Sequence, residues 1–441
     1  MSALTTLASS PETRPWRRAA GWLAFLGPFF FLSYGGASFL ASHRAGVGSM
    51  VFPWERHIPF IGWTIIPYCS IDLLYGLSVF VCATRAELDM HARRLLTAQV
   101  IAVTCFIAFP LRFAFEVPKV DGLSGLLFTA LASFDQPFNQ APSLHIALLV
   151  VLWRLYAVHV PRTMLWLLHG WFALIGVSVL TTYQHHFFDV PTGALLGFFC
   201  LWTWPDNRPS PLTTAVLIDD RRRRTLAARY LVGAMLLSLL AWWIGGMGLW
   251  LFWGVAALVL VAVNYALIGA DGFQKDPDGR MSLAARVLLA PYQLGVFINS
   301  RLRTRRDPKP SAIRDGVWLG RFPSAAEAAR YGSVVDLCAE LPGGSTGVHW
   351  LATPLLDLAT PSAAQLAGAA SAIDQAQRSG TALVCCALGF QRSAAAVATW
   401  LLASGRARDV DEAITMVRAA RPRVVIGSDL RAAIAAAGRS A

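Results

Sequence analysis

The stretch MGLWLFWGVAALVLVAVNYALIG, residues 247–269, contains no charged side chain. An α-helix needs about 20 consecutive, mostly apolar residues to cross the hydrocarbon core of a bilayer, so this stretch predicts a membrane-spanning helix. Working outward from it, the same criterion finds seven further windows, bounded by charged residues, glycine or proline. The eight predicted spans cover residues 21–42, 60–82, 95–115, 144–160, 163–183, 187–204, 227–245 and 247–269.

The composition of the whole chain agrees with these spans. Of its 441 residues, 55% are hydrophobic and only 15% are charged, against about 25% charged residues in an ordinary soluble domain. This excludes a wholly soluble enzyme and also a disordered chain, which would combine low hydrophobicity with high charge. The net charge of +12 fits basic cytoplasmic loops and anionic lipid headgroups. No nucleic-acid-binding motif is present, and the seven scattered cysteines indicate no disulfide framework.

Lysine and arginine gather on one side of the predicted spans, in the segments before the first span and after the second, fourth and sixth. The basic residues on the other side are Arg44, Arg56, Arg112 and Lys119. Basic residues in short loops are retained on the cytoplasmic side of a membrane. We therefore expect both termini to be cytoplasmic, and the loops after spans one, three, five and seven to face outward.

The chain divides by composition into a membrane domain at 1–270, a linker at 271–309 and a smaller domain at 310–441. In the linker, residues 281–306 are apolar and end in several arginines, which is typical of an amphipathic segment at the membrane surface or of an ordinary connecting helix. The last domain is expected to be α/β, because strand-like and helical patterns alternate in it. The strand-like runs cover 333–338 and 381–386, and the helical patterns cover 362–378, 393–404 and 409–418.

Two polar clusters interrupt the apolar sequence at the same predicted membrane face. One is Pro-Ser-Leu-His at 142–145, and the other runs from Ser178 to Asp189. Ionisable groups inside a membrane are candidates for a functional site. On a helix, His185 and Asp189 share one face, where the carboxylate can orient the imidazole and raise its basicity. His185 would then attack phosphorus, His145 would protonate the leaving oxygen, and Ser143 would bind a phosphate oxygen.

These clusters, Pro142-Ser143-x-His145 and Ser178-x6-His185-x3-Asp189, resemble the second and third motifs of the type 2 phosphatidic acid phosphatase superfamily. The resemblance covers about residues 95–205 and implies a six-helix core. It also implies that His185 is the nucleophile that forms a phosphohistidine, that His145 is the general acid and that Asp189 orients the nucleophile. Ser143 and Ser178 are then expected to bind substrate.

The sequence departs from this family at two places. Val179 stands where an arginine usually follows the serine, and in place of the first motif only Arg112, after Pro110, remains to bind substrate phosphate. The inositol phosphorylceramide synthase branch, which transfers a phospho-headgroup instead of hydrolysing it, also tends to lack that arginine and is similar around Gln184-His185-His186. On that comparison, His186 could share the work of His185. Polar groups that could recognise a polyol are Asp135, Gln136, Asn139 and Gln140.

A second motif lies near the C-terminus, where Cys386-Ala-Leu-Gly389-Phe-Gln-Arg392-Ser393 joins a predicted strand to a predicted helix. A turn of this length can direct backbone N–H groups inward around an anion, while the arginine binds the anion through two donors. The helix dipole and Arg392 both favour the thiolate of Cys386, and Ser393 can donate a hydrogen bond to it. Asp357 lies upstream of this loop, just before the helix predicted at 362–378, and is the candidate general acid.

This loop resembles that of the dual-specificity branch of the protein tyrosine phosphatase superfamily, and the match runs from about residue 315 to Arg421-Pro422. The resemblance implies that Cys386 is the nucleophile, Arg392 the phosphate binder with the Gly389 loop, and Asp357 the acid. Cys385 replaces the usual histidine and is either a buried strand residue or a resolving thiol. The variable loop positions contain no lysine or arginine, which favours a monophosphorylated lipid or a phosphoprotein as substrate.

Together the two motif sets resemble bacterial fusions of a lipid phosphatase-like domain with a dual-specificity phosphatase, which implies a multi-pass protein of the bacterial inner membrane. The predicted function is a phosphatase with an outward histidine site, acting as lipid phosphatase or phosphotransferase, and a cytoplasmic cysteine site. Two alternatives stay open: a headgroup transferase coupled to a product phosphatase, and a non-catalytic sensor or transporter of phosphate lipids. We expect no metal or other cofactor and no nucleic-acid partner.

Overall fold

The computed structural model describes residues 14–134, 136–344 and 347–439. It is mostly helical and divides into two compact units, residues 1–213 and 214–441. The sequence had placed the end of the membrane domain at residue 270, so the last two predicted spans lie in the second unit and not in the first. Each unit is described by itself below.

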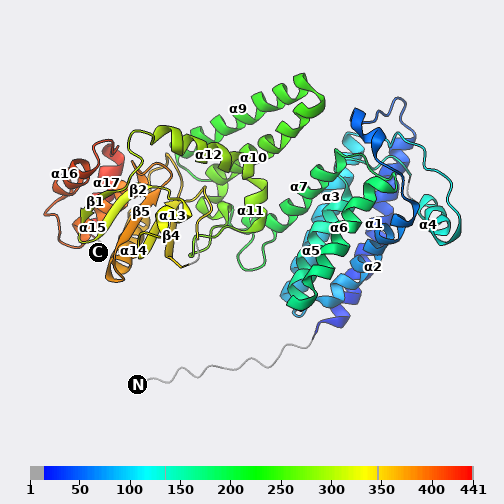
Figure 1. The fold of residues 1–441 in the computed structure, drawn as a ribbon, viewed down its shortest axis with the longest axis horizontal. Helices are drawn as coiled ribbons and strands as arrows, with labels where there is room; N and C mark the ends of the chain where they lie inside the picture. The colour runs from blue at the N-terminus through cyan, green and yellow to red at the C-terminus, as the bar shows by residue number, and fades with distance from the viewer. Residues whose placement is uncertain (1–13, 135, 345–346, 440–441) are drawn as a thin grey trace. The chain divides into compact units, whose positions relative to one another are not determined.

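The first unit is a helical bundle (Figure 1). Its helices are α1 (Trp16–Ser42), α2 (Ile65–Val81), α3 (Arg85–Ala108), α4 (Gly122–Ala132), α5 (Leu144–His159), α6 (Leu165–Thr181) and α7 (Asp189–Thr203), and α8 (Pro211–Thr214) lies at the division. One apolar core joins six of these helices, with Leu26, Ile71, Phe106, Leu152, Ile175 and Leu196 among its buried members.

Helices α5 and α7 pack closely because α7 presents glycine to α5. A Cβ atom added at Gly193 would lie 2.4 Å from the Ser143 carbonyl oxygen, and one added at Gly197 would lie 2.6 Å from Val150 Cβ. Only glycine therefore fits at these two positions. The close approach brings together the N-terminal ends of α5 and α7, where the two histidine motifs lie.

Five helices among the described residues are long and apolar enough to cross a membrane: Trp16–Ser42, Gly62–Val81, Arg162–Thr181, Arg221–Ile244 and Gly246–Ile268. The other three predicted spans correspond to α3, α5 and α7. Of these, α5 and α7 have only 16 and 15 residues, while α3 carries charged residues in its first turns. The count of eight spans therefore stays a prediction.

Helix α3 differs in its bounds from the predicted window 95–115. It begins at Arg85 because the Thr84 hydroxyl accepts a hydrogen bond from the amide of Glu87, which caps the helix. It ends at Ala108, ahead of Pro110, which cannot continue a helix. Arg112 consequently lies in the exposed loop that follows α3 and not in a span.

The second unit begins with a helical hairpin and continues into an α/β domain (Figure 1). Its helices are α9 (Arg221–Ile244), α10 (Leu251–Val263), α11 (Leu283–Leu288), α12 (Ala290–Arg303), α13 (Ala325–Ala328), α14 (Ala363–Arg378), α15 (Arg392–Ala403), α16 (Val410–Ala420) and α17 (Ser428–Arg439). Its strands are β1 (Ser311–Arg314), β2 (Val317–Arg321), β3 (Ser333–Cys338), β4 (His349–Leu355) and β5 (Ala382–Cys386). The predicted strands at 333–338 and 381–386, and the three predicted helices after residue 360, are confirmed.

The five strands form one sheet in the order β1-β2-β5-β3-β4, with β5 at its centre. Strand β1 is antiparallel to β2, and the other pairs are parallel. Side chains alternate along β5, so Val384 and Cys386 pack against the core that α14 to α17 form. Leu383 and Cys385 face the opposite core, together with Ala328 of α13 and Val296 of α12. The nucleophile candidate thus sits at the carboxyl end of the central strand.

The hairpin of α9 and α10 belongs to the second unit because hydrogen bonds tie it and the segment after it to the α/β domain. The Tyr265 hydroxyl donates to the Asp357 carbonyl at 2.9 Å. The buried Lys275 ammonium lies 2.5 Å from Asp336 Oδ2 and donates to the Cys338 and Leu341 carbonyls at 2.6 and 2.7 Å. An unpaired charge at that depth would cost several kcal/mol, roughly 3–5.

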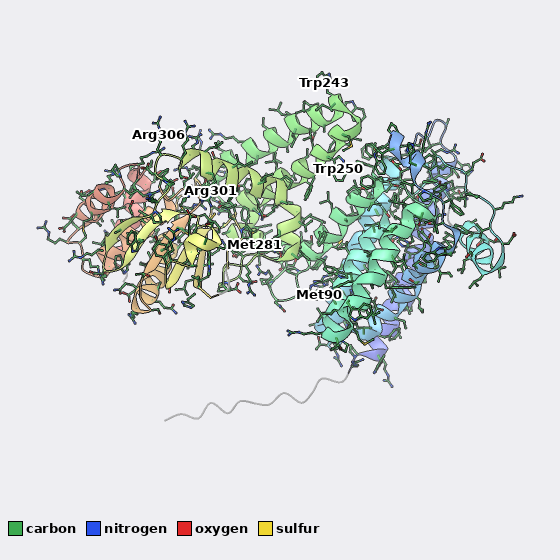
Figure 2. All side chains as sticks on the ribbon, viewed as in Figure 1. Met90, Trp243, Trp250, Met281, Arg301 and Arg306 are labelled. Carbon is green, nitrogen blue, oxygen red and sulfur yellow. The ribbon has the colours of Figure 1, made fainter. Side chains whose placement is uncertain are left out.

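The segment predicted to be amphipathic, 281–306, forms α11 and α12. One face of α12 packs inward, since Val296 joins the apolar core and the Ser300 hydroxyl donates to the Ala387 carbonyl. The other face exposes Leu294, Phe297, Ile298 and Leu302, each between 45% and 60% accessible. Arg301 and Arg306, marked in Figure 2, lie at the end of this segment. Helix α12 therefore packs one face against the α/β domain and exposes a second face that is apolar and ends in arginines.

Candidate active sites

The Cys386 loop connects the end of β5 to the start of α15. Gly389 adopts a φ of +74°, and a Cβ atom there would lie 2.4 Å from the Gly320 carbonyl carbon. A glycine is thus required for both reasons, and the loop closes tightly over β2. The Gly389 amide and the Ser393 hydroxyl donate to Cys386 Sγ at 3.3 and 3.2 Å. The thiol is therefore surrounded by donors that stabilise its anion.

The electrostatics of the loop favour the thiolate of Cys386. Burial alone would raise the pKa of the Cys386 thiol, but the Arg392 guanidinium and the Ser393 hydrogen bond outweigh burial and hold the pKa below its ordinary value. For the neighbouring Cys385, burial raises the pKa well above the ordinary range, although the Lys275 ammonium opposes the rise. The two adjacent cysteines therefore differ in reactivity, because only the thiolate is a nucleophile.

Arg392 is almost fully buried and is held from one side by Glu340. Its Nη1 donates to Glu340 Oε1 and Oε2 at 3.0 and 2.9 Å and to the Leu355 carbonyl at 2.7 Å. Its Nε and Nη2 have no hydrogen-bond partner among the described residues. These two donors are the pair with which a guanidinium binds a phosphate through two parallel hydrogen bonds.

Glu340 was not singled out from the sequence. It follows β3 closely, it is 1% exposed, and its Oε1 also accepts a hydrogen bond from the Asp357 amide at 3.1 Å. One carboxylate thus positions both the phosphate-binding arginine and the candidate acid. The available signal was an acidic residue two positions behind a strand-like run that is apolar except for Ser333 and Asp336, a position where a buried charge needs a specific partner.

Asp357 lies beside Arg392, with Oδ1 3.2 Å from Nη2, and its side chain is 35% exposed. Burial raises the pKa of the Asp357 carboxyl above its ordinary value, although the Arg392 guanidinium opposes the rise. A carboxyl group with a raised pKa keeps its proton to higher pH, as a general acid requires. The structure therefore brings Cys386, Arg392, Ser393 and Asp357 together, as the sequence predicted.

Three tyrosines stand next to this cluster and were also missed. Tyr230 comes from α9, Tyr265 from the segment after α10, and Tyr292 from α12. The Tyr230 and Tyr292 hydroxyl groups are 3.3 Å apart, and the Tyr230 and Tyr265 rings are 5.4 Å apart. All three interact electrostatically with Glu340. The sequence did not indicate a role for these tyrosines, because a tyrosine in an apolar span usually marks the membrane interface.

The histidine motifs of the first unit also meet. The Ser143 amide donates to the Asp189 carbonyl at 3.1 Å, which joins the start of α5 to the start of α7. His185 Nδ1 lies 3.2 Å from Asp189 Oδ2. Because a carboxylate accepts hydrogen bonds, this contact assigns the proton to Nδ1 and leaves the lone pair on Nε2. The arrangement matches the predicted nucleophile and its orienting carboxylate.

His145 and His185 line the same small cavity, of about 50 Å³, together with Tyr68 and Asp72. The His145 ring stacks on Tyr68, with centroids 4.2 Å apart. Its buried Nε2 finds no hydrogen-bond partner within the described part of the chain. A nitrogen so placed can exchange a proton with a group that enters the cavity, as the predicted general acid must.

His186 is used differently. Its Nδ1 lies 2.9 Å from Glu55 Oε2, and its Nε2 accepts a hydrogen bond from the Ala114 amide at 3.1 Å. Both ring nitrogens are therefore engaged, and Glu55 also accepts from the Phe187 amide. Glu55, in a short 3₁₀ helix (Pro53–His57), was missed because no motif surrounds it. It fixes the loop that carries His185.

A larger cavity of about 940 Å³ is lined by Arg112, Gln136, Asn139, Gln140 and His185, whereas Ser143 and Ser178 are not part of its lining. The side-chain oxygens of Asn139 and Gln140 are buried without a hydrogen-bond partner among the described residues. The Ser143 hydroxyl caps α5 through the Ile146 amide, and the Ser178 hydroxyl donates to the Ile175 carbonyl. Asp135 lies outside the described residues. The described residues contain no cluster of three or more metal-ligating side chains.

Several solved structures resemble part of this chain. Tk-PTP in its active form is 26% identical, and the match covers 30% of this chain and 98% of that protein at a TM-score of 0.28. Human DUSP28 is 25% identical, with 30% and 95% covered at a TM-score of 0.28. PTPMT1 is 21% identical, with 30% and 95% covered at a TM-score of 0.28, and it is also known in complex with PI(5)P. No protein-family model and no curated protein matches the chain.

Proposed function

We propose that the chain is a membrane-bound phosphoric monoester hydrolase whose Cys386 site removes phosphate from membrane lipids. The observation that carries the proposal is the convergence at one loop of an anion-stabilised thiol, two guanidinium nitrogens without a hydrogen-bond partner among the described residues, and a carboxyl of raised pKa beside them. These are a nucleophile, a phosphate clamp and a general acid, which are the groups that cleavage of a phosphate monoester needs.

The first half of the reaction transfers phosphorus to sulfur. Cys386 Sγ attacks phosphorus while the bond to the lipid oxygen breaks, and Asp357 gives its proton to that oxygen. The Arg392 Nε and Nη2 donors and the loop amides stabilise the equatorial phosphate oxygens. The products are a cysteinyl phosphate, a lipid alcohol and an Asp357 carboxylate.

The second half restores the enzyme with water. The Asp357 carboxylate takes a proton from a water molecule. The oxygen of that water attacks phosphorus, and the sulfur–phosphorus bond breaks. The leaving thiolate is stabilised by the Ser393 hydroxyl and the Gly389 amide, which already point at Sγ. Inorganic phosphate leaves, and Cys386 and Asp357 return to their starting protonation states.

The lipid character of the substrate is supported by the hairpin. Helices α9 and α10 are apolar enough to cross a membrane, and Tyr265 at the end of this hairpin donates to the Asp357 carbonyl. Helix α12, whose Ser300 contacts the Cys386 loop, exposes four large apolar side chains on its other face. Such a face lies in the membrane interface. The loop is thereby expected at the bilayer surface, within reach of a headgroup phosphate.

The number of phosphates is limited by the loop itself. Its variable side chains, Ala387, Leu388, Phe390 and Gln391, are uncharged, and Ala387 and Phe390 are buried. A headgroup with several phosphates would need further cations free to bind it, but the nearest ones are engaged, since Arg421 donates to the Gly389 and Lys309 carbonyls and Arg423 to Asp307. A lipid with a single phosphate monoester is the better match.

The test uses the full chain in detergent or in nanodiscs, with phosphatidic acid and an aryl phosphate as substrates. Cys386→Ser should abolish phosphate release from the aryl phosphate, since a serine hydroxyl is not ionised at neutral pH. In a His185→Ala background, which removes the proposed histidine site, it should abolish release from phosphatidic acid as well. Cys385→Ser is the matched control, because that side chain faces the opposite core, and it should retain activity. Phosphate release from the aryl phosphate by Cys386→Ser equal to that of the wild type would overturn the proposal.

A second activity is supported by the pairing of His185 with Asp189 beside His145. For this site we propose a lipid phosphate phosphatase or phosphotransferase that works through a phosphohistidine at His185 Nε2. Val179, buried where the family has arginine, leaves the site with less cationic charge. The two reactions differ in the group that accepts the phosphate: water in the phosphatase and a lipid alcohol in the phosphotransferase. A site that binds phosphate lipid without turnover is the remaining alternative.

A further inference from the structure

The end of the first unit away from the histidines contains a cavity of about 610 Å³. Met90, labelled in Figure 2, marks this end. The charged residues that line the cavity are four arginines and two carboxylates, namely Arg93, Arg94, Arg154 and Arg208 with Glu87 and Asp206. Its apolar lining includes Leu155 and Val158. The cavity is thus basic on one part and apolar on another.

The arginines converge through a single carboxylate. Asp206 Oδ1 lies 2.7 Å from Arg94 Nη2, and Asp206 Oδ2 lies 2.6 Å from Arg154 Nη2. Arg94 is 2% exposed and also donates to the Trp204 carbonyl. The Arg93 guanidinium stacks over the Trp204 ring, 5.2 Å from its centroid. An ordinary belt of basic residues would be spread over the surface and solvated. Here Arg94 is buried, and Asp206, Arg154 and the Trp204 carbonyl surround it.

The two carboxylates that line the cavity are already engaged. Asp206 is shared by two arginines, and Glu87 accepts from the Ala83 amide at 2.7 Å and lies 3.3 Å from His159. Arg94, the buried arginine, is paired with Asp206, whereas Arg93 is exposed and the Arg154 side chain is 35% exposed, so both stand where an entering anion can reach them. An anion in the cavity would gain charge-assisted hydrogen bonds from these guanidinium groups.

We propose that this cavity binds the phosphate headgroup of an anionic phospholipid. The arginines supply the phosphate contacts, the Trp204 ring lies at the level where aromatic side chains meet headgroups, and Leu155 and Val158 contact the start of an acyl chain. Basic pockets between membrane helices bind such headgroups in this way. The proposal is independent of both active sites, since Val158 lies about 20 Å along α5 from His145 at the ordinary helical rise.

The experiment measures the thermal stability of the purified full chain in detergent during titration with short-chain phosphatidylglycerol, a diester that neither proposed hydrolase should cleave. A bound ligand stabilises the folded state in proportion to the logarithm of its concentration over Kd. Arg93→Gln is the main variant because it leaves the Arg94–Asp206–Arg154 ion pairs in place. It should weaken binding about tenfold, the usual effect of losing one charge-assisted contact. Arg17→Gln, an exposed arginine outside the cavity, is the matched control and should bind like the wild type.

Two further titrations identify the ligand. Phosphatidylcholine should stabilise wild type and Arg93→Gln equally, because its headgroup has no net charge. Inorganic phosphate should stabilise the wild type far less than phosphatidylglycerol does. Equal affinity of wild type and Arg93→Gln for phosphatidylglycerol would overturn the proposal, and equal protection by inorganic phosphate would replace it with a free-anion site. Should Arg93→Gln unfold early without lipid, Arg208→Gln repeats the comparison.

Discussion

The hydroxyl group of Tyr265 donates a 2.9 Å hydrogen bond to the backbone carbonyl of Asp357. Tyr265 ends an apolar hairpin, and Asp357 is the candidate general acid of the cysteine site. A side chain of the hairpin therefore holds the loop that must deliver a proton to the leaving group. Since the Asp357 amide is held by Glu340, both backbone groups of the acid are fixed by residues brought from elsewhere in the unit.

Tyr265→Phe should lower kcat for a lipid phosphate about 2- to 10-fold, because it removes one hydrogen bond worth roughly 0.5–1.5 kcal/mol. With an aryl phosphate the loss should be smaller, since an acidic leaving group needs less help from the acid. Tyr156→Phe is the control, because Tyr156 makes the same kind of bond, to the Leu74 carbonyl, in the other unit. An equal loss with both substrates would contradict a role through Asp357.

The cysteine site could be predicted from the sequence where its residues are close in the chain. The loop from Cys386 to Ser393 carries its own signals, because strand, glycine, arginine and helix follow one another. Glu340 and Tyr265 could not be found in this way. Parallel pairing of β3 with β5 brings Glu340 to Arg392, and a buried partner of that kind has no local pattern.

The first unit shows the same contrast. The spacing of four between His185 and Asp189 was enough to predict their contact, although His185 lies in the turn before α7 and not on a helix as the prediction assumed. The partner of His186, Glu55, comes from a loop more than a hundred residues earlier. The structure groups the last two predicted spans with the second unit, whereas the predicted boundary at residue 270 followed hydropathy, which describes what a helix can be immersed in and not which domain it packs against.

Glu340→Gln should lower kcat/KM about 10- to 100-fold, the usual effect of losing a charged partner of a buried hydrogen bond. The amide oxygen still accepts from Asp357, but the negative charge that orients Arg392 is gone. Steady-state kinetics with an aryl phosphate gives the value. Glu412→Gln, which removes a surface ion pair with Arg408 on the same unit, should change it little. Wild-type kcat/KM in Glu340→Gln would show that Arg392 is positioned without this carboxylate.

The pH dependence of kcat/KM should be bell-shaped. Activity needs the Cys386 thiolate, whose pKa is lowered, so activity rises as the pH increases through that pKa. It also needs protonated Asp357, whose pKa is raised, so activity falls as the pH increases further. Asp357→Asn should remove the fall at high pH and slow the reaction by roughly 10²–10⁴-fold. A fall that persists unchanged in Asp357→Asn would assign the acid to another group.

Both chain termini are expected in the cytoplasm, which places the Cys386 site in a reducing compartment where a reactive thiol survives. The reason is the gathering of arginine on one side of the spans. A green fluorescent protein fused after Ala441 should fluoresce, and alkaline phosphatase fused at the same place should be inactive because it needs export. Active alkaline phosphatase at that position would reverse the topology and with it the compartment of the cysteine site.

The histidine site should form a covalent adduct through His185. Incubation of the full chain with lipid carrying labelled phosphate, followed by alkaline quenching, should trap an acid-labile phosphohistidine. The label should be present in Cys386→Ser, which cannot form the cysteinyl phosphate, and absent in the Cys386→Ser/His185→Ala double variant, which separates the two sites. His186→Gln is a further comparison, since both nitrogens of His186 are already engaged and its loss should reduce labelling only through the loop. In His145→Ala the adduct should form slowly, because that residue serves the leaving group.

A transferase would discharge the adduct faster to a lipid alcohol than to water, whereas a hydrolase would show the reverse. Tight binding of phosphate lipid that survives His185→Ala, without any adduct, would instead establish a sensor or transporter.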